Sequence, residues 1–555
     1  MRIVVVGGVA GGMSAAARAR RLDENAEIIV FERGEHPSFA NCGLPYYVSG
    51  EIEQEQDLLV QTPESLRETL AIDVRVRHDV IGVDPAAKTV LVRNADGVST
   101  VAYDELILSP GAVANRPPIP GLDSPRVQTL RTVGDAVRLK DTVTDGATRA
   151  VVLGAGFIGL EAAEGLRLQG LTVDIVELAA HVLPALETEI ASLVTAELRD
   201  NLGITVHDCV SATAIETGPV RDVVVLSDGT RLPADVVVLS VGVTPDTAVF
   251  AEAGVETERG AIVVDGRGHT NLDGIWAVGD ATVSTDAVTG LRRPVPLAGP
   301  ANRAGRQVAD HILTPERARP IPATVGTAIV RAGGLTAAMT GANRAALAGS
   351  DNDYFTVHLH PANHAGYFPG AEQIHMLMHV RTSDGLILGA QAVGLDGVDK
   401  RIDVLATAIR NRMTAPELID LDLAYAPPYG SAKDPVNLAG MIAENVLDGE
   451  LKLWYAEQLD ADDADDYLIL DVRNQDEYDQ DHLPGAMLVP GTQVRERLEE
   501  IREAAAGRPI RVHCASGKRS YLACRTLTAA GLEAANLSGG LETLRALIPG
   551  EPALV

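Results

Sequence analysis

The chain has 555 residues, a formal net charge of −29 at pH 7 and four cysteines. This length exceeds the size at which single hydrophobic cores stop growing, so three or four domains are expected. The negative charge argues against nucleic-acid and anionic-membrane partners, because the field of the protein repels phosphate polymers. Four cysteines in so long a chain cannot form a disulfide framework and are typical of a reducing compartment.

The chain begins with MRIVVVG, whose apolar run is too short for a signal peptide and leads directly into a glycine-rich turn. This pattern predicts a buried first strand. No apolar run reaches the roughly 20 residues that a membrane-spanning helix needs. We therefore expect a soluble, cytoplasmic protein without a membrane partner.

Residues 2–6 form a β-branched run of the kind found in a parallel strand that is buried on both faces. The sequence GGVAGG and an alanine-rich helix over residues 13–22 follow. A second strand over residues 27–31 ends at Glu32, whose carboxylate can accept a hydrogen bond from a ribose hydroxyl. This order predicts a dinucleotide-binding unit, although a valine replaces the middle glycine of the fingerprint. The three fingerprint positions are Gly7, Val9 and Gly12.

A second unit of the same kind follows the strand at residues 150–153. It has the full GAGFIG fingerprint, a helix from Leu160 and a strand over residues 172–176 that ends at Glu177. An acidic residue there repels a 2′-phosphate, which favours NADH over NADPH unless a basic neighbour overrides it. The fingerprint glycines are Gly154, Gly156 and Gly159.

Two such units need two nucleotides, and hydride chemistry usually pairs a diffusible nicotinamide with a bound flavin. The segment IWAVGDA, residues 275–281, resembles the segment with which the flavin-dependent pyridine nucleotide-disulfide reductase superfamily returns to its flavin. The resemblance implies FAD on the first unit and NADH on the second. It also implies that Asp280 contacts the ribityl chain of the flavin.

Cys42 lies in the stretch SFANCGLPYY, and Tyr47 stands where many superfamily members carry a second redox cysteine. A lone cysteine beside a flavin can store two electrons as a sulfenic acid, a persulfide or a mixed disulfide. The stretch resembles the coenzyme A disulfide reductase group. That resemblance implies a channel for coenzyme A lined by Ser14, Arg18, Arg21, Ser38 and Asn41, with Asn302 near flavin and substrate. An ordinary solvated face is the alternative for the two arginines, which lie one helical turn apart.

Tyrosines at positions 367, 425 and 429 would ordinarily be packing or interface residues. In the coenzyme A disulfide reductase group, two tyrosines at this spacing come from the partner subunit and reach the active cysteine, and a lysine beyond them binds coenzyme A. The resemblance assigns these roles to Tyr367, Tyr425 and Lys433. It implies a homodimer with residues 326–440 as the interface domain.

A helix is predicted over residues 439–447. The acidic stretch LDADDADDY, residues 459–467, follows it at the exposed start of a new domain.

Further on, IRVHCASGKRS runs from a strand through a glycine-containing loop into a helix. Successive N–H groups, the helix dipole, Lys518 and Arg519 all favour an anion at Cys514 and lower its pKa. A phosphatase loop is the rival interpretation.

The two segments YLILDVRNQDEYDQDHLPGA and IRVHCASGKRS together resemble a single-domain rhodanese. This resemblance implies that Cys514 carries sulfane sulfur as a persulfide, with Arg519 beside it, and that His482 is structural.

We expect the two remaining cysteines, Cys209 and Cys524, to be buried in the core. No cluster shows metal-ligand spacing, so the sequence predicts no metal site.

The predicted fold is α/β, with two Rossmann-like dinucleotide-binding domains, an α+β dimerisation domain and a C-terminal α/β rhodanese domain. The expected division is 1–115 and 249–325 for the FAD-binding domain, 116–248 for the NAD(P)H-binding domain, 326–440 for dimerisation, 441–458 for a linker and 459–555 for rhodanese.

The expected activity is NAD(P)H- and FAD-dependent reduction of coenzyme A persulfide, coenzyme A disulfide and polysulfides at Cys42, with sulfane sulfur handled by Cys514. The partners would then be small thiols, persulfides and polysulfides. Three alternatives remain open. They are an NADH peroxidase or oxidase with a Cys42 sulfenic acid, a sulfurtransferase whose flavoprotein part senses redox state, and an electron-transferring flavoprotein scaffold.

Overall fold

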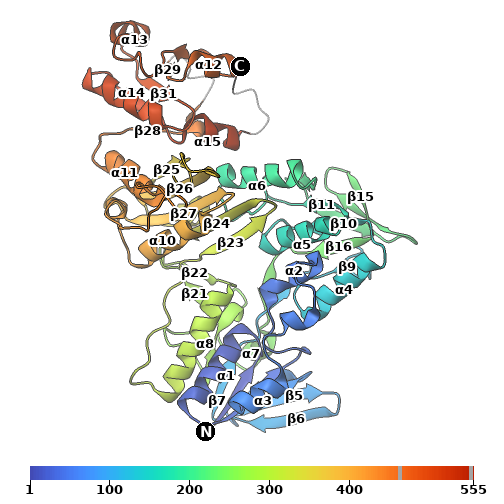
Figure 1. The fold of residues 1–555 in the computed structure, drawn as a ribbon. Coiled ribbons are helices and arrows are strands. Elements are labelled where there is room, and N and C mark those ends of the chain that lie inside the picture. The colour runs from blue at the N-terminus through green and yellow to red at the C-terminus, as the bar shows by residue number, and fades with distance from the viewer. Residues whose placement is uncertain (460–465, 549–553, 555) are drawn as a thin grey trace. The chain divides into compact units, whose positions relative to one another are not determined.

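A computed structural model describes residues 1–459, 466–548 and 554 (Figure 1). The chain divides into two compact units, one of residues 1–180 with 202–326 and the other of residues 181–201 with 327–555. Parallel and antiparallel sheets with covering helices confirm the predicted α/β class. Most of the acidic stretch at 459–467 lies outside the described residues. No helix in the described parts of the chain is both long and apolar enough to cross a membrane.

The first unit contains a parallel sheet in the order β20-β7-β1-β2-β3. Alternate side chains of β1 enter two cores, because Val5 packs with helices α1 and α8 while Val4 packs with the antiparallel sheet β4-β5-β6. Figure 1 shows α1 and α8 side by side on one face of the sheet. Burial on both faces explains the unbroken apolar run of β1. The bounds are β1 (Arg2–Val6), α1 (Ala10–Leu22), β2 (Glu27–Glu32), β3 (Asp73–Val76), β4 (Asp79–Asp84), β5 (Thr89–Asn94), β6 (Gly97–Ala102), β7 (Glu105–Leu108), β20 (Ile275–Ala277) and α8 (Ala298–Leu313).

The second parallel sheet of this unit has the order β12-β11-β10-β16-β9. Helix α5 follows β10, and an antiparallel sheet, β13-β14-β15, covers the other face with Ile215, Val224 and Leu232. Both fingerprint helices begin one turn earlier than predicted, because their first turns include fingerprint residues. The bounds are β9 (Val127–Gln128), α4 (Val133–Thr144), β10 (Arg149–Leu153), α5 (Phe157–Leu168), β11 (Thr172–Val176), β12 (Thr205–His207), β13 (Ala212–Glu216), β14 (Asp222–Leu226), β15 (Arg231–Ala234) and β16 (Val236–Leu239).

Short elements complete the first unit, and one of the cysteine predictions fails there. Cys209 was expected in the core, but it is exposed and has a left-handed φ of 56° in the turn after β12, so that prediction is wrong. The remaining elements are η1 (Asn41–Gly43), α2 (Leu44–Ser49), η2 (Glu55–Leu58), α3 (Pro63–Leu70), β8 (Ala112–Ala114), β17 (Val243–Pro245), α7 (Ala248–Glu252), β18 (Thr257–Glu258), β19 (Ala261–Ile262), η3 (Gly279–Ala281), β21 (Val283–Thr285) and β22 (Arg292–Pro294).

The second unit begins with an antiparallel sheet in the order β23-β24-β27-β26-β25, against which α6 and α10 pack. Helix α11 begins four residues before the predicted start, at Pro435. Proline is favoured in a first helical turn, and Asp434 caps the helix by accepting from the Val436 N–H at 3.1 Å. The bounds are α6 (Thr188–Asp200), β23 (Ala328–Ala332), β24 (Leu335–Gly341), α9 (Arg344–Ala348), β25 (Tyr354–Leu359), β26 (Ile374–Arg381), β27 (Ile387–Gly394), α10 (Val398–Arg410), η4 (Pro416–Leu418) and α11 (Pro435–Leu447).

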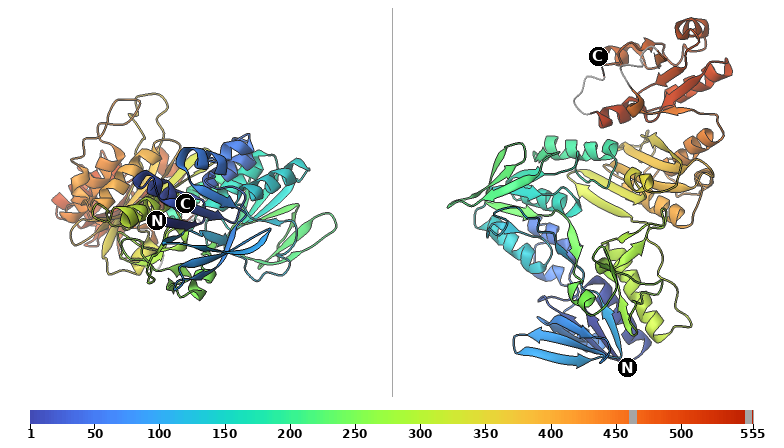
Figure 2. Two further views of the ribbon diagram at one scale, coloured as in Figure 1. Left: turned by 90° about the horizontal axis from the view of Figure 1, so that it is seen from below. Right: turned by 180° about the vertical axis from the view of Figure 1, so that it is seen from behind.

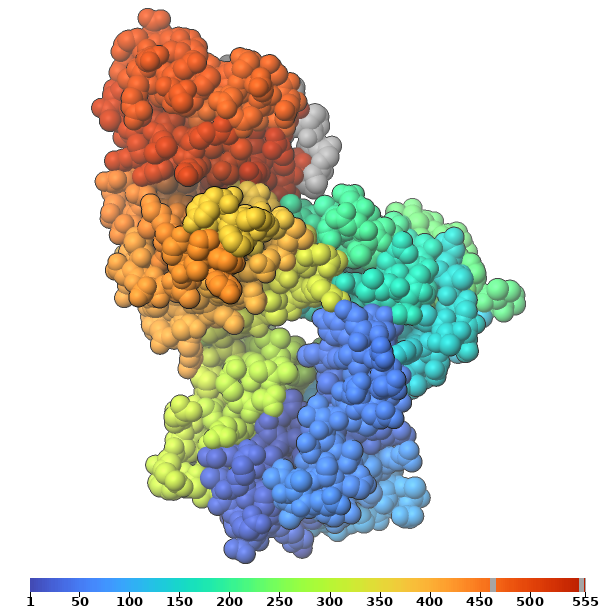
Figure 3. Space-filling model, in the orientation of Figure 1, coloured from blue at the N-terminus to red at the C-terminus, as the bar shows by residue number. Residues whose placement is uncertain are grey.

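The C-terminal part of the second unit is a parallel sheet in the order β28-β32-β31-β29-β30. Leu470 faces a core with α13 and α14, whereas its neighbour Ile469 faces a core with α15. This part contacts the antiparallel sheet of the same unit, where the His358 N–H of β25 donates to the Ser538 hydroxyl at 3.2 Å, and Figures 2 and 3 show the two parts next to each other. The bounds are β28 (Leu453–Trp454), η5 (Ala456–Gln458), β29 (Leu468–Asp471), α12 (Gln475–Gln480), β30 (Met487–Leu488), α13 (Leu498–Ala505), β31 (Ile510–His513), α14 (Lys518–Ala529), β32 (Ala534–Leu537) and α15 (Gly540–Leu547).

Candidate active site

Both glycine fingerprints form tight turns between a strand and a helix. A Cβ on Gly12 would lie 2.0 Å from the Gly7 carbonyl oxygen, and a Cβ on Gly159 would lie 2.0 Å from that of Gly154. The first and last glycines are therefore required by the packing of the turn itself. A Cβ on Gly156, by contrast, would meet no atom within 4 Å. This open middle position suits the close approach of a pyrophosphate.

Val9 takes the equivalent middle position in the first fingerprint. It precedes α1 with φ −110°, a value that any residue adopts. The substitution thus leaves the turn intact, and the residues present fit a dinucleotide at both turns.

An acidic side chain is hydrogen bonded to the backbone of each turn. Glu32 accepts from the N–H of Gly8 at 2.8 Å, and Glu177 accepts from the N–H of Ala155 at 2.7 Å. The two carboxylates thus occupy equivalent places at the ends of β2 and β11. A carboxylate there can accept from a ribose hydroxyl and disfavours a 2′-phosphate.

The predicted flavin contact, Asp280, lies in η3 directly after β20, so the chain does return to the first sheet. Burial raises the pKa of Asp280, and Arg131 opposes this with a guanidinium nitrogen 3.6 Å from the carboxylate. The sequence analysis missed Arg131. Only the tertiary fold brings it to Asp280, because it lies outside both fingerprints.

Cys42 lies in η1, and its side chain is exposed, as is that of Asn41. The pKa of the Cys42 thiol is raised, first by partial desolvation and then by the carboxylates of Glu161 and Asp280. Ser38 has a left-handed φ of 48° four residues earlier. All four cysteines of the chain are free thiols.

Glu161 is a further residue that the sequence analysis missed. It lies in α5 of the second fingerprint and accepts a hydrogen bond from the Tyr46 hydroxyl at 3.1 Å. The helix that starts one nucleotide site therefore also places a negative charge near the reactive cysteine.

The predicted channel residues on α1 meet α8. The Ser14 hydroxyl donates to the Asn302 side-chain oxygen, which joins two predicted substrate residues. Arg18 lies 2.6 Å from the Asp310 carboxylate, so α8 compensates its charge, whereas Arg21 is exposed. Arg20 of the same basic run is buried and donates to backbone carbonyls.

In the second unit, the hydroxyls of Tyr367 and Tyr425 lie 3.2 Å apart. Both side chains are exposed, at 77% and 51%. The hydrogen bond to Tyr425 raises the pKa of Tyr367. Lys433 is also exposed, next to Asp434, which is buried and lies 2.8 Å from the Arg401 guanidinium.

Cys514 directly follows β31 and is only 1% exposed. The Ser520 hydroxyl donates to its sulfur at 3.2 Å, a contact that the sequence analysis did not assign. Arg519 hydrogen bonds to Cys514 and makes two 2.6 Å hydrogen bonds to Glu477. These interactions, first the hydrogen bonds to Glu477, raise the pKa of Arg519 further.

The residues around this loop are mostly structural. Burial lowers the pKa of His513 to about 4, so this histidine is neutral at pH 7. His482 stacks on Tyr478 with ring centroids 3.8 Å apart, which agrees with its predicted structural role. Cys524 is buried as predicted, and burial raises its pKa, so its thiol stays protonated.

The fold and these sites define a flavin- and pyridine-nucleotide-dependent oxidoreductase with a second cysteine domain. The pyridine nucleotide-disulphide oxidoreductase family matches residues 1–305, and the dimerisation domain of the same family matches residues 330–435. The rhodanese-like domain matches residues 452–546. These matches favour rhodanese over the rival phosphatase interpretation.

Known relatives cover most or all of the chain. The coenzyme A disulfide reductase of Staphylococcus haemolyticus is 34% identical over 451 residues, which cover 80% of this chain and 100% of that protein. The reduced CoADR-RHD of Bacillus anthracis is 39% identical, with a TM-score of 0.96 over 99% of this chain and 98% of that chain. An NAD-dependent persulfide reductase from A. fulgidus is 36% identical, with a TM-score of 0.91 over 98% and 100% of the two chains. The chain belongs to the coenzyme A disulfide reductase family of pyridine nucleotide-disulphide oxidoreductases and carries a C-terminal rhodanese domain.

Proposed function

We propose that the chain reduces coenzyme A persulfide, coenzyme A disulfide and polysulfides at Cys42, with sulfane sulfur handled at Cys514. The observation that carries this proposal is a lone, exposed thiol near Asp280, in a chain that also holds a rhodanese domain. Its redox partner must then be an external thiol. The substrates of the S. haemolyticus and A. fulgidus relatives support coenzyme A disulfide and a persulfide as substrate classes.

The proposal assigns FAD to the first glycine turn, with Glu32 and Asp280, and NADH to the second, with Glu177. When bound, these cofactors supply hydride transfer and a two-electron path to sulfur. The open space at Gly156 and the carboxylates at the mouths of both turns support this assignment. The six-segment domain division predicted from the sequence is part of the same proposal.

The resting state would be a mixed disulfide between Cys42 and coenzyme A. Its two-electron reduction breaks the S–S bond and leaves a Cys42 thiolate and a coenzyme A thiol. The Cys42 thiolate then attacks the inner sulfur of a coenzyme A persulfide, which restores the mixed disulfide and releases hydrosulfide. With coenzyme A disulfide, the leaving group is a coenzyme A thiolate instead.

The acidic surroundings of Cys42 suit this chemistry. Glu161 and Asp280 raise the pKa of Cys42, and a thiolate with a higher pKa is a stronger nucleophile once it forms. They also disfavour a permanent free thiolate. The site therefore favours a sulfur that is kept bonded to another sulfur between turnovers.

The coenzyme A channel is assigned to Ser14, Arg18, Arg21, Ser38, Asn41 and Asn302. The hydrogen bond between Ser14 and Asn302 supports a common site. The salt bridge of Arg18 to Asp310 leaves Arg21 as the more available cation for a phosphate.

A homodimer would complete the site. Tyr367 and Tyr425 would reach Cys42 of the other subunit and protonate or orient the leaving sulfur, and Lys433 would bind coenzyme A. Two exposed tyrosines with hydrogen-bonded hydroxyls, in a domain that matches the dimerisation family, support this assignment.

Mass spectrometry of the oxidised, denatured protein tests the proposal. We expect coenzyme A on Cys42, released by a reductant, and a free thiol at Cys209. A Cys42 peptide that carries only a sulfenic acid would instead support a peroxidase or oxidase, and a Cys42 peptide that stays a free thiol through turnover would support the scaffold alternatives.

A further inference from the structure

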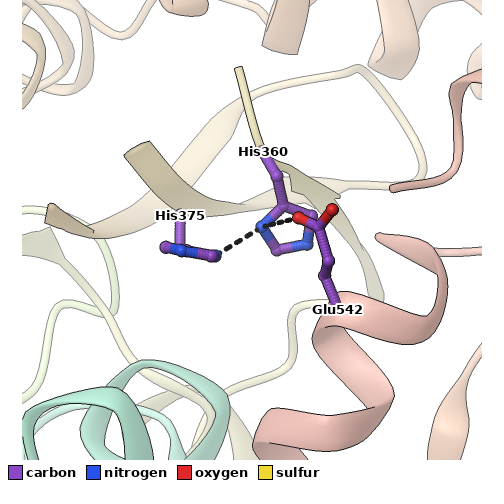
Figure 4. A group of neighbouring side chains, drawn as sticks. All are labelled: His360, His375 and Glu542. Carbon is purple, nitrogen blue, oxygen red and sulfur yellow. Dashed lines mark hydrogen bonds and ion pairs between the residues drawn. The ribbon is translucent and has the colours of Figure 1, made fainter. Parts of the chain in front are cut away.

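Three possible metal ligands meet within the second unit, where its two sheets adjoin. His360 follows β25, His375 lies in β26, and Glu542 lies in the first turn of α15 (Figure 4). Their ligand atoms all lie within 4.8 Å of one another. The His360 Nδ1 atom is 2.8 Å from the His375 Nδ1 atom and 3.7 Å from the Glu542 Oε2 atom.

The far nitrogen of His360 and the Glu542 oxygen that faces His360 already have hydrogen-bond partners. The His360 Nε2 atom lies 2.9 Å from the Thr543 hydroxyl, and the Gln373 amide donates to Glu542 Oε2 at 2.8 Å. If Nε2–H donates to Thr543, the Nδ1 lone pair of His360 points at His375 and Glu542. Such outer hydrogen bonds fix the tautomer and orientation of metal-binding histidines.

The separation of 2.8 Å between the two Nδ1 atoms fits one N–H···N hydrogen bond with a single proton, which either histidine can donate. Burial lowers the pKa values of His360 and His375 and raises that of Glu542. The nitrogen that accepts in this hydrogen bond has a free lone pair, which is what a metal ion needs from an imidazole. A divalent cation in place of the proton would also give the Glu542 carboxylate an opposite charge.

We propose that His360, His375 and Glu542 bind one Zn²⁺ ion. Two imidazoles and one carboxylate match the ligand preference of zinc, with a fourth position left for water. Tetrahedral bonds of about 2.0–2.1 Å place ligand atoms about 3.4 Å apart, close to the observed 2.8 and 3.7 Å. The ligand atoms of His375 and Glu542 lie within 4.8 Å of each other, so these side chains would have to draw together around the ion.

The ion would join two domains of one chain, because two ligands come from the antiparallel sheet and the third from the rhodanese part. The backbone supports a close junction there, since a Cβ on Gly539 would lie 2.7 Å from the His358 Cβ. The N–H groups of Leu541 and Glu542 donate to the carbonyls of Cys514 and Ala515 at 3.0 and 2.9 Å. Zinc would therefore hold the helix that supports the Cys514 loop against the dimerisation domain.

The spacing of these residues in the sequence does not indicate a metal site. His360 and His375 lie on either side of a loop, and Glu542 is far away in the chain. The sequence analysis therefore predicted no metal site, and this proposal departs from that prediction.

Zinc content of the full-length flavoprotein tests the proposal. The protein is stripped with a chelator, loaded with ZnCl₂, dialysed and analysed by plasma mass spectrometry. We expect the wild type to keep one more Zn²⁺ per chain than Glu542→Gln and His375→Gln, while the control Glu533→Gln, in the same domain, matches the wild type. Zinc held by cysteine thiolates is common to all four proteins and cancels in the comparison.

A second readout is the melting temperature, because a ligand that binds only the folded state raises it. Zn²⁺ should raise the Tm of the wild type and Glu533→Gln but not that of Glu542→Gln. Should His375→Gln not fold, Gln373→Ala takes its place, since Gln373 is exposed and donates to the Glu542 carboxylate without being one of the three proposed ligands. We expect it to weaken zinc binding about tenfold. Equal zinc retention by wild type and Glu542→Gln would overturn the proposal.

Discussion

Cys42 and Cys514, the two cysteines to which the proposed chemistry is assigned, lie in opposite kinds of surroundings. Cys42 is exposed in a short 3₁₀ turn, and partial desolvation together with two carboxylates raises its pKa. Cys514 is 1% exposed and lies between a serine hydroxyl and an arginine. The contrast indicates two tasks. The first thiol is placed to exchange bonds with an external thiol, and the second is placed to shelter a bound sulfur.

Replacing each cysteine in turn gives the largest expected effects. Cys42→Ser should reduce NADH-dependent turnover of coenzyme A disulfide at least 10³-fold, because the serine hydroxyl cannot form the mixed disulfide. Cys514→Ser should leave that turnover within about twofold and reduce sulfane-sulfur transfer to cyanide at least 10²-fold. NADH oxidation and thiocyanate formation are measured on the same preparations.

Cys209→Ser is the matched control, since Cys209 is exposed and has no assigned role. It should change neither rate. Equal losses of both activities in Cys42→Ser and Cys514→Ser would show that the two cysteines share one task. That result would contradict the separate tasks assigned to them here.

The variant Glu161→Gln tests whether the negative charge of Glu161 helps to raise the pKa of Cys42. Removing this negative charge should lower the pKa of Cys42 part of the way toward its ordinary value, since desolvation and Asp280 still raise it. The reduced variant should therefore react with iodoacetamide several times faster than wild type at pH 7.5, measured on the Cys42 peptide by mass spectrometry. Glu53→Gln, at an exposed position nearby in the sequence, should react at the wild-type rate. A slower reaction in Glu161→Gln would contradict the electrostatic cause.

Glu477→Gln tests the ion pair beside Cys514 and has the smallest expected effect. Hydrogen bonds from Arg519 lower the pKa of Glu477 to about 2. A carboxyl group with a lowered pKa stabilises the fold above its unfolded pKa of about 4.3, and this stability is lost as the pH falls toward 2. Because the pair is partly exposed, its contribution is about 0.5–1 kcal/mol.

Thermal unfolding between pH 7 and pH 3 measures this prediction. The Tm of Glu477→Gln should be lower than that of wild type at pH 7, and the difference should become smaller by pH 3, where part of the stabilisation is already lost. Glu533→Gln, whose salt bridge to Lys452 lies on the surface, serves as the control. A constant Tm difference across this range would assign the effect to packing instead of charge.

The features that were predicted correctly are local in the sequence. A strand, a glycine turn and a helix lie within about 30 residues, so both dinucleotide units were recognisable from their order. The roles of Tyr367 and Tyr425 came from a family resemblance and stay predictions, whereas the hydrogen bond between their hydroxyls was not predicted. Cys209 was predicted wrongly, because residue type favours burial while its turn requires a left-handed backbone at the surface.

The sequence by itself determined the α/β class, the two nucleotide turns, the lone Cys42 and the Cys514 loop, because each depends on neighbours along the chain. Only the tertiary structure decided which charges surround those cysteines. Glu161, Asp280 and Arg131 reach the Cys42 region from separate elements, and Glu477 reaches Arg519 from another helix. The group of His360, His375 and Glu542 likewise exists only once two sheets are packed together. Electrostatic and coordination distances act through space, and no periodicity in the sequence encodes them.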